Sequence, residues 1–212
     1  TLHRRQIKDP GPTCTHILAY NPERRTLLME ASVRHATALD VAPAADTLAA
    51  AFQDYPWTRW VIPEDGYMGR LHRLQSLCLE HARQHGVVMV AESCRGVLAL
   101  LPPDAPEPDS TVTQEIVELH GSRINRLTES TPVPGAWVLA TLGVDPRHQG
   151  RGLGCVLIRQ GIDAVTAQGA QAVVLQTSDQ RNVDLYHRHG FHTVSHNSDG
   201  PGPHIWSMER RL

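Results

Sequence analysis

The chain has 212 residues, of which 41% are hydrophobic and 20% are charged, and its formal net charge at pH 7 is −2. This length suits one domain with a sizeable core. The near balance of acidic and basic residues excludes the strongly basic profile that is typical of a nucleic-acid-binding domain. No apolar run approaches the roughly 20 residues that a membrane-spanning helix needs. Composition therefore predicts a soluble protein whose partners are neither nucleic acids nor membranes.

The cysteines are scattered along the chain and form no CxxC pair. They are Cys14, Cys78, Cys94 and Cys155. This spacing argues against a zinc ribbon or a disulfide scaffold and suits a reducing compartment. The apolar stretch TCTHILAY is too short and too polar for a signal peptide, so we expect a cytoplasmic protein. Residues 1–30 show no clear period and are expected to form an N-terminal extension of one domain over residues 31–212.

Hydrophobic spacing predicts the elements of the first half of the chain. Strands are expected over residues 32–40, 87–92 and 96–101, the last two forming a hairpin. Helices are expected over residues 43–55, 67–86 and 111–130, the third interrupted at Gly121. In the second helix the expected buried residues are Met68, Leu71, Leu74, Cys78 and Ala82.

The second half of the chain alternates strands and helices. Strands are expected over residues 135–144, 171–178, 191–195 and 204–210, and helices over residues 153–169 and 181–190. The whole order, a hairpin and helices followed by β-α-β-α-β-β, predicts a single α/β (α+β) domain with a central mixed β-sheet flanked by helices.

The stretch HQGRGLG joins a predicted strand to a predicted helix. Its glycines are Gly150, Gly152 and Gly154. Glycine permits positive φ and lacks a Cβ, so successive peptide N–H groups can converge on one point. A helix start adds unpaired N–H groups and a partial positive charge, and Arg147 and Arg151 add formal charge. This combination predicts an anion site suited to a phosphate or diphosphate, rather than a tight turn without a ligand.

Two common nucleotide-binding loops do not match this stretch. A dinucleotide-binding GxGxxG loop that begins at Gly150 would need its third glycine at Cys155. A Walker loop would need GK[ST] after four residues, and that sequence is absent. Hydride transfer and nucleotide hydrolysis therefore lose support.

The spacing V-x-P-x-x-Q-G-x-G-x-G of residues 144–154 resembles the acyl-CoA loop of the GNAT superfamily of N-acetyltransferases. This resemblance implies a splayed central sheet, acetyl-CoA as co-substrate and no metal. By position it implies that the coenzyme A diphosphate binds to Gln149, Gly150, Arg151, Gly152, Leu153 and Gly154. It further implies that the pantetheine arm lies along Leu142, Gly143 and Val144 and contacts Asn182.

Acetyl transfer to an amine needs a neutral amine, stabilisation of the carbonyl oxygen and protonation of the leaving thiolate. The resemblance assigns the last role to Tyr186, four residues after Asn182 and so on the same helix face. The alternative for Tyr186 is a packing role. The Val144 N–H is the expected oxyanion donor. The glutamate that many relatives carry before the glycine loop is missing, so the base stays open among a water chain, Asp54 and Glu64.

The acceptor is the least specified part. Five stretches, among them TLAAAFQDYPWTRW and LQTSDQRNVDLYHRHGF, are similar to those of the puromycin N-acetyltransferases. This likeness implies a primary amine of a small molecule, such as a puromycin-like aminonucleoside or another amine antibiotic, and hence antibiotic resistance. A protein N-terminal or lysine acetyltransferase and a non-catalytic acyl-CoA-binding module are the alternatives, and a homodimer is left open. Tyr55, Trp57 and Trp60 are expected either to stack on the acceptor or to pack in the core.

Two further features are predicted to have no chemical role. The histidines near the C-terminus are read as a solvated edge rather than a metal site; they are His187, His189, His192 and His196. Cys155, at a helix start, is expected to turn into the core rather than to act as a nucleophile.

Overall fold

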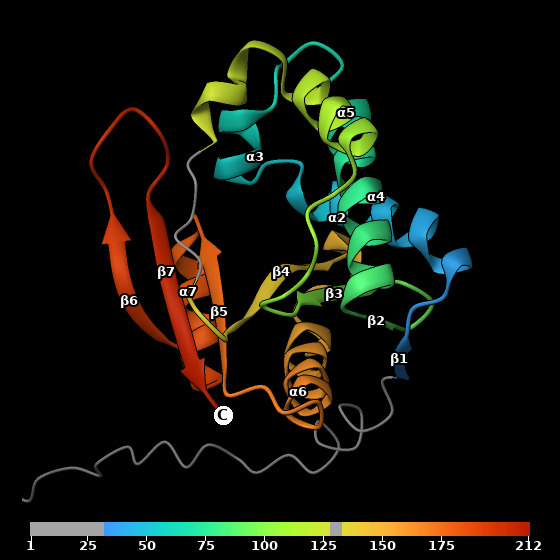
Figure 1. Ribbon diagram of the computed structural model, residues 1–212, viewed down its shortest axis with the longest axis vertical. Coiled ribbons are helices and arrows are strands. Elements are labelled where there is room, and N and C mark those ends of the chain that lie inside the picture. Colours follow the sequence, from blue (N-terminus) through green and yellow to red (C-terminus); the bar gives the residue numbers. More distant parts are fainter. Residues whose placement is uncertain (1–31, 128–132) are drawn as a thin grey trace, which may run out of the picture.

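The computed structural model describes residues 32–127 and 133–212 (Figure 1). The predicted N-terminal extension over residues 1–30 lies outside this part. The described residues form a seven-stranded sheet with the order β1-β2-β3-β4-β5-β7-β6. Neighbouring strands are antiparallel except β4 and β5, which are parallel. The predicted mixed sheet flanked by helices is therefore confirmed.

The strands are β1 (Val33–His35), β2 (Val87–Ala91), β3 (Gly96–Leu101), β4 (Trp137–Val144), β5 (Ala172–Thr177), β6 (His192–Asn197) and β7 (Ile205–Arg211). The α-helices are α2 (Val41–Phe52), α3 (Pro56–Val61), α4 (Tyr67–His85), α5 (Ser110–His120), α6 (Leu153–Thr166) and α7 (Gln180–Arg188). Short 3-10 helices are η1 (Ala38–Asp40), η2 (Gly121–Arg126) and η3 (Pro146–His148). None of the helices in the described ranges is long and apolar enough to cross a membrane.

The sheet is covered on both faces. In Figure 1, α2 and α4 lie above the β2–β4 part of the sheet and α6 lies below it. Side chains alternate between the two faces along a strand. Met89 and Leu98 belong to the core between the sheet and helices α6 and α7, whereas Val88 and Val97 belong to the core between the sheet and helices α2 and α4. Burial on both faces explains why the hairpin strands read as continuous apolar runs.

Helix α4 buries a slightly different stripe from the one expected. Leu71, Leu74 and Ala82 are buried, but Met68 is 42% exposed and Cys78 is exposed. Their chain neighbours Tyr67 and Leu79 are buried instead. The stripe is therefore displaced by one residue at these two positions. Helix α3 was not expected either, although proline at its first position, Pro56, suits a helix start.

Strand β4 carries a β-bulge. On β3, Ala99 lies opposite Thr141, but the next residue, Leu100, lies opposite Leu139. Ala140 thus has no partner on β3. A bulge of this kind bends its strand and increases the local twist.

The bulge also changes which side chains of β4 face the core. Trp137 and Leu139 pack against α6 and α7 before the bulge, and Leu142 and Val144 do so after it. The inward positions therefore change from odd to even numbers. The continuous buried strand expected over residues 135–144 is instead a bent strand in which Val138 is 40% exposed.

Strands β4 and β5 separate soon after they begin. They pair only at Trp137–Val173 and Val138–Val174, although β4 runs on to Val144 and β5 to Thr177. The sheet is therefore splayed, and the edge of β4 beyond Val138 has no neighbouring strand on the β5 side.

The first strand is joined to η1 by a carboxylate. Asp40 accepts hydrogen bonds from both terminal nitrogens of Arg34, each at 2.7 Å, and from the backbone N–H and hydroxyl of Thr37 at 2.7 and 2.8 Å. The Cys94 thiol, at 3.5 Å, adds a contact from the β2–β3 turn. The Arg34 guanidinium holds the pKa of Asp40 well below its usual range.

We expect Asp40→Asn to lower the free energy of unfolding by about 1–3 kcal/mol, because it removes charge-assisted hydrogen bonds from a buried site. A carboxyl whose pKa is lowered by folding stabilises the protein above its unfolded pKa, and this stability is lost as the pH falls towards the folded pKa. Urea unfolding at pH 7 and in acid should therefore show the loss at pH 7 and a smaller difference in acid. Asp46→Asn, an exposed control on α2, should change little. Equal losses in both variants would contradict this account.

Candidate active site

The glycine loop connects the end of β4 to α6 by way of η3. The Asp145 carboxylate caps η3 by accepting the Arg147 N–H at 2.9 Å. Gly150 and Gly152 follow with φ of 74° and 85°, in the left-handed region that glycine adopts without strain. An added Cβ on Gly154 would meet ordinary contacts, the nearest at 3.9 Å. The first two glycines of the motif are thus required by the backbone, and the third is not.

The two arginines of the loop differ in whether they are free to bind an anion. Arg147 is paired with Asp145, with 2.7 Å between Nη2 and Oδ2, and its guanidinium holds the pKa of Asp145 well below the usual range. Arg151 is exposed, and the ion pairs of the described residues do not include it. The side chain of Gln149 donates to the Val144 carbonyl at 3.1 Å. Arg151 and the loop N–H groups, rather than Arg147, are therefore available to an anion.

The open edge of β4 exposes alternate peptide groups. The Asp145 N–H donates to Arg95 O at 2.8 Å, on the β3 side. Because peptide groups alternate between the two sides of an antiparallel strand, those of Leu142 and Val144 point into the gap towards β5. The peptide group of Gly143 points to β3. Gly143 has a packing role instead, since a Cβ there would lie 2.6 Å from Leu48 on α2.

Tyr186 lies on α7, beside the gap. Its ring is buried and packs edge-on against Phe191, with 5.5 Å between the centroids. Burial raises the pKa of Tyr186 far above its usual range, and the neighbouring Tyr55 raises it further. The hydroxyl makes no hydrogen bond with the described residues. It is not among their polar side-chain atoms that are fully buried and lack a hydrogen-bond partner. The residue thus combines a packed ring with an unengaged, protonated hydroxyl.

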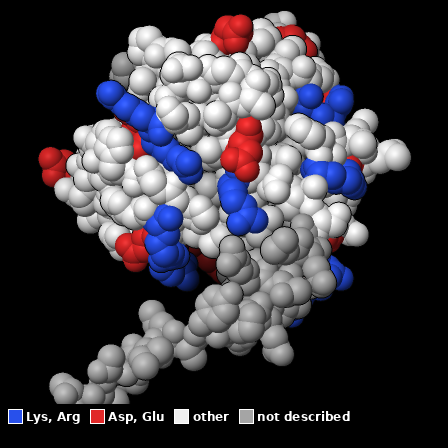
Figure 2. All heavy atoms as spheres, turned by 90° about the horizontal axis from the view of Figure 1, so that it is seen from below, with Lys and Arg blue, Asp and Glu red and all other residues white. Residues whose placement is uncertain are grey.

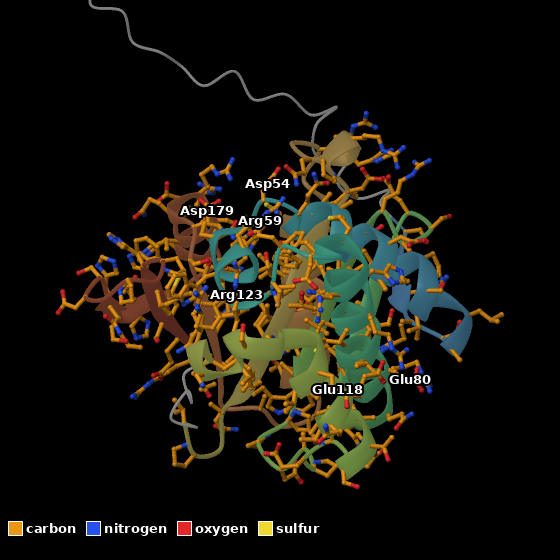
Figure 3. All side chains as sticks on the ribbon, turned by 90° about the horizontal axis from the view of Figure 1, so that it is seen from above. Asp54, Arg59, Glu80, Glu118, Arg123 and Asp179 are labelled. Atoms are coloured by element: carbon orange, nitrogen blue, oxygen red, sulfur yellow. The ribbon has the colours of Figure 1, made fainter. Side chains whose placement is uncertain are left out.

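A hydrogen-bonded network joins the α2–α3 loop to the end of β5. The Tyr55 hydroxyl is 3.0 Å from Thr177 Oγ1 and accepts the Ser178 N–H at 2.7 Å. Asn182 donates its side-chain N–H to Thr177 Oγ1 at 3.3 Å, and the Trp57 N–H reaches the Ser178 hydroxyl at 3.2 Å. Figure 3, seen from above, labels Asp54 and Arg59 of the α2–α3 region and Asp179, which precedes α7. Asn182 therefore lies in the network, one turn from Tyr186.

Thr177 and Ser178 were not expected as site residues. Thr177 ends β5 and Ser178 follows it. Both precede Asp179, whose carboxylate caps α7 by accepting the Arg181 N–H at 2.9 Å. A polar pair between a strand and a helix cap was the available sequence signal. It could not reveal the partner, because Tyr55 is more than 120 residues away in the chain.

Trp60 is held between two other segments. The Arg126 guanidinium lies 4.0 Å above its ring and donates to its carbonyl at 2.8 Å. On the β6–β7 loop, an added Cβ on Gly202 would be 3.1 Å from the Trp60 Nε1. Trp57 and Trp60 also pack against the cluster that contains Ile62 and Leu71. Of the two expectations for these rings, packing is the contact that the described residues display.

The two candidate bases are surface residues bound to arginine. Asp54 is 84% exposed and lies 3.2 Å from Arg59. Glu64 is 64% exposed and lies 3.3 Å from Arg59. Exposure to water screens such charges strongly, so neither carboxylate lies in the buried setting that is typical of a general base.

Among the described residues, no group of three or more His, Cys, Asp or Glu side chains is placed to hold a metal ion. His187 is exposed, whereas His189 is half-buried at the end of α7. The expectation that Cys155 turns into the core is wrong. Val156 and Leu157 take the buried positions, and Cys155 lines a surface cavity with Arg159.

The chain is similar to known acetyltransferases. A model of the acetyltransferase (GNAT) family matches residues 50–191. The "histone acetyltransferase HPA2 and related acetyltransferase" of Corynebacterium glutamicum matches 85% of this chain and 96% of its own, with 25% identity and a TM-score of 0.65. The yncA protein of Salmonella typhimurium, whose structure contains its cofactor acetyl-CoA, matches 86% and 94%, with 17% identity and a TM-score of 0.53. The ribosomal-protein-alanine N-acetyltransferase of Brucella melitensis matches 85% and 99%, with 15% identity and a TM-score of 0.56.

The family match covers more than half of the chain and includes β4, the glycine loop and α7. The features described above fall within it: two glycines in the left-handed region before a helix, an unpaired strand edge and a tyrosine beside the gap. The chain therefore belongs to the GNAT family of acetyltransferases, and it is an acetyl-CoA-dependent acetyltransferase.

Proposed function

We propose that the enzyme transfers the acetyl group of acetyl-CoA directly to a primary amine of a small molecule in the cytoplasm. Acetyl-CoA supplies an activated thioester, and the protein binds it, orients it and moves the protons. The acceptor class rests chiefly on one observation, the contact between Trp60 and Gly202 that joins α3 to the β6–β7 loop. The described cysteines are unpaired, which suits a reducing compartment.

Residues 149–154 form the proposed binding site of the coenzyme A diphosphate. The positive φ of Gly150 and Gly152 supports this role, because it turns successive N–H groups towards the start of α6. In this proposal the side chain of Gln149 supports the loop through Val144, and Arg151 supplies charge. The peptide group of Leu142 and the N–H of Val144, which face the gap, suit an arm that carries amides of its own.

Tyr186 is the proposed acid. A phenol whose pKa is raised by burial keeps its proton throughout the neutral range, and it can give that proton to the leaving thiolate. The Val144 N–H is the proposed donor to the carbonyl oxygen, because it faces the gap and no strand pairs with it there. A neutral amine is obtained either by desolvation in the site or through a water chain, since both nearby carboxylates are paired at the surface.

A closed acceptor side supports a small molecule over a peptide. The α2–α3 loop is bound to the end of β5 by Tyr55, and Trp60 is enclosed between Arg126 and Gly202. A peptide acceptor needs an open groove, and these contacts hold three segments together on the side that we propose for the acceptor. Among small amines we propose a puromycin-like aminonucleoside or another amine antibiotic, as the resemblance noted in the sequence implies.

An acceptor panel tests the function. With acetyl-CoA present, we expect thiol release and an acetylated product, identified by mass spectrometry, from puromycin or another small primary amine. Product from peptides alone would establish a protein acetyltransferase, and tight acetyl-CoA binding without any product would establish a non-catalytic module. Gly202→Ala, which pushes against Trp60, should raise the acceptor KM and leave the acetyl-CoA KM unchanged.

Gly150→Ala tests the diphosphate loop. An alanine at this φ of 74° is strained by about 1–2 kcal/mol, so we expect the loop to shift and the KM for acetyl-CoA to rise about ten-fold. Gly169→Ala is the matched control: its φ is 86°, and both glycines have open space where the Cβ would lie. Both variants should lose similar thermal stability, but only Gly150→Ala should lose affinity. Equal KM values in the two variants would place the diphosphate elsewhere.

Tyr186→Phe tests the acid. We expect kcat to fall about 100-fold or more, with the KM for acetyl-CoA nearly unchanged, because the phenol acts on the leaving group rather than on binding. Tyr67→Phe removes another buried hydroxyl, which donates to Thr58 at 2.9 Å, and should leave kcat unchanged. A normal single-turnover rate in Tyr186→Phe would exclude the proposed role.

A further inference from the structure

A cavity of about 140 Å³ lies between α6 and the end of α7. Its lining includes Cys155, Arg159, Asp163, His189 and Arg210. The acetyl transfer proposed above uses none of these side chains. Two arginines thus border a hollow that the proposed chemistry leaves unexplained.

Arg210 is held in position by the turn that ends α7. Its Nη1 donates to the carbonyl of His189 at 2.8 Å. Its side chain lies against Gly190, where an added Cβ would be 3.6 Å from Nε, and Gly190 has a φ of 80° that favours glycine. A guanidinium with further donors is therefore positioned at the cavity in advance.

Positive charge gathers around this cavity. Burial lowers the pKa of His189, and the charges of Arg210, Arg188 and Arg159 lower it further. His189 is thus neutral at pH 7 while the arginines stay charged. The ion pairs of the described residues include neither Arg159 nor Arg210. Asp163 is the acid in the lining, so the balance of charge favours an anion.

The cavity begins within one helical turn of the glycine loop. Cys155 lies in the first turn of α6 and Arg159 one turn further along, and the helix rises about 9 Å from Leu153 to Arg159. Coenzyme A carries its diphosphate and its 3′-phosphate on the same ribose. A protein that holds the first group at the start of α6 therefore needs to accommodate the second nearby.

We propose that Arg159 and Arg210 bind the 3′-phosphate of coenzyme A and so let the enzyme distinguish acetyl-CoA from thioesters that lack this phosphate. This inference rests on the proposed seat of the diphosphate at residues 149–154. Planar guanidinium groups offer paired donors to phosphate oxygens. Free phosphate is another source of the same chemistry, and binding measurements separate the two.

Titration calorimetry with CoA and dephospho-CoA tests the site without turnover. We expect the full chain to bind CoA about ten-fold more tightly than dephospho-CoA. Arg159→Gln should reduce this preference to about two-fold, because it leaves one arginine at the cavity, and should not change the affinity for dephospho-CoA. Equal affinities for the two ligands in the wild type, with inorganic phosphate still binding, would overturn the proposal in favour of a separate phosphate site.

Two further variants control for net charge. Arg73→Gln removes the same formal charge from a half-exposed position on α4 and should keep the ten-fold preference. Asp163→Asn removes the acid from the lining and should raise the affinity for CoA about two-fold, with no change for dephospho-CoA. A loss of preference in Arg73→Gln equal to that in Arg159→Gln, or weaker CoA binding in Asp163→Asn, would overturn the assignment.

The loop variant separates this inference from the proposed function. If Gly150→Ala weakens both ligands equally and keeps the preference for CoA, both proposals are supported. If Gly150→Ala weakens both ligands while the wild type shows no preference, the loop stands and the 3′-phosphate site is wrong. If the preference for CoA depends on Arg159 but Gly150→Ala binds both ligands as tightly as the wild type, only the proposed diphosphate site at residues 149–154 is contradicted.

Discussion

Strands β4 and β5 begin as hydrogen-bonded parallel neighbours and move apart after Val138. Buried peptide groups need partners, so a strand edge opened inside the sheet is unfavourable unless another group satisfies it. One such group is the Gln149 side chain, which bonds the Val144 carbonyl. The bulge at Ala140 bends β4 where the separation occurs. The remaining unpaired peptide groups of β4 can form hydrogen bonds with a bound arm that carries amides.

The two walls of the gap are fixed independently. On the β4 side, Gly143 lets α2 approach so closely that any Cβ would collide with Leu48. On the β5 side, Tyr55 ties Thr177 and Ser178 to the loop before α3. Neither contact involves the Tyr186 hydroxyl, which makes no hydrogen bond with the described residues. Contacts that hold both sides in place favour alignment of the reacting groups that we propose for this gap.

Local patterns in the sequence predicted the parts of the fold that depend on local physics. The hairpin of β2 and β3, the helix α6 and the backbone need for Gly150 and Gly152 all follow from side-chain periodicity or the conformational freedom of glycine. The family resemblance supplied the expectation of a splayed sheet. The bulge at Ala140 is not visible in the sequence, because it is defined by pairing with β3.

Contacts between distant segments produced the remaining differences. The resemblance places Gly143 along the pantetheine arm, but the absence of its side chain allows α2 to pack closely against β4. Trp60 could be expected either at a ligand or in a core, and its partners Arg126 and Gly202 come from two separate stretches. Cys155 has the sequence context of a core residue, yet it borders the cavity beside Arg159. Such roles depend on three-dimensional neighbours that spacing along one segment does not encode.

Net charge is a poor guide to the anion that this enzyme uses. A chain of charge −2 must bind a ligand with several phosphate charges, and on the face shown in Figure 2 the basic side chains lie in separate small groups. At the glycine loop, Arg147 is largely neutralised by Asp145. In the binding proposed above, the attraction is therefore local and comes from peptide N–H groups at the start of α6 and from Arg151 and Arg159. Oriented peptide dipoles act within a few ångströms and are rigidly placed, so they can select a diphosphate where a diffuse positive surface would attract any polyanion.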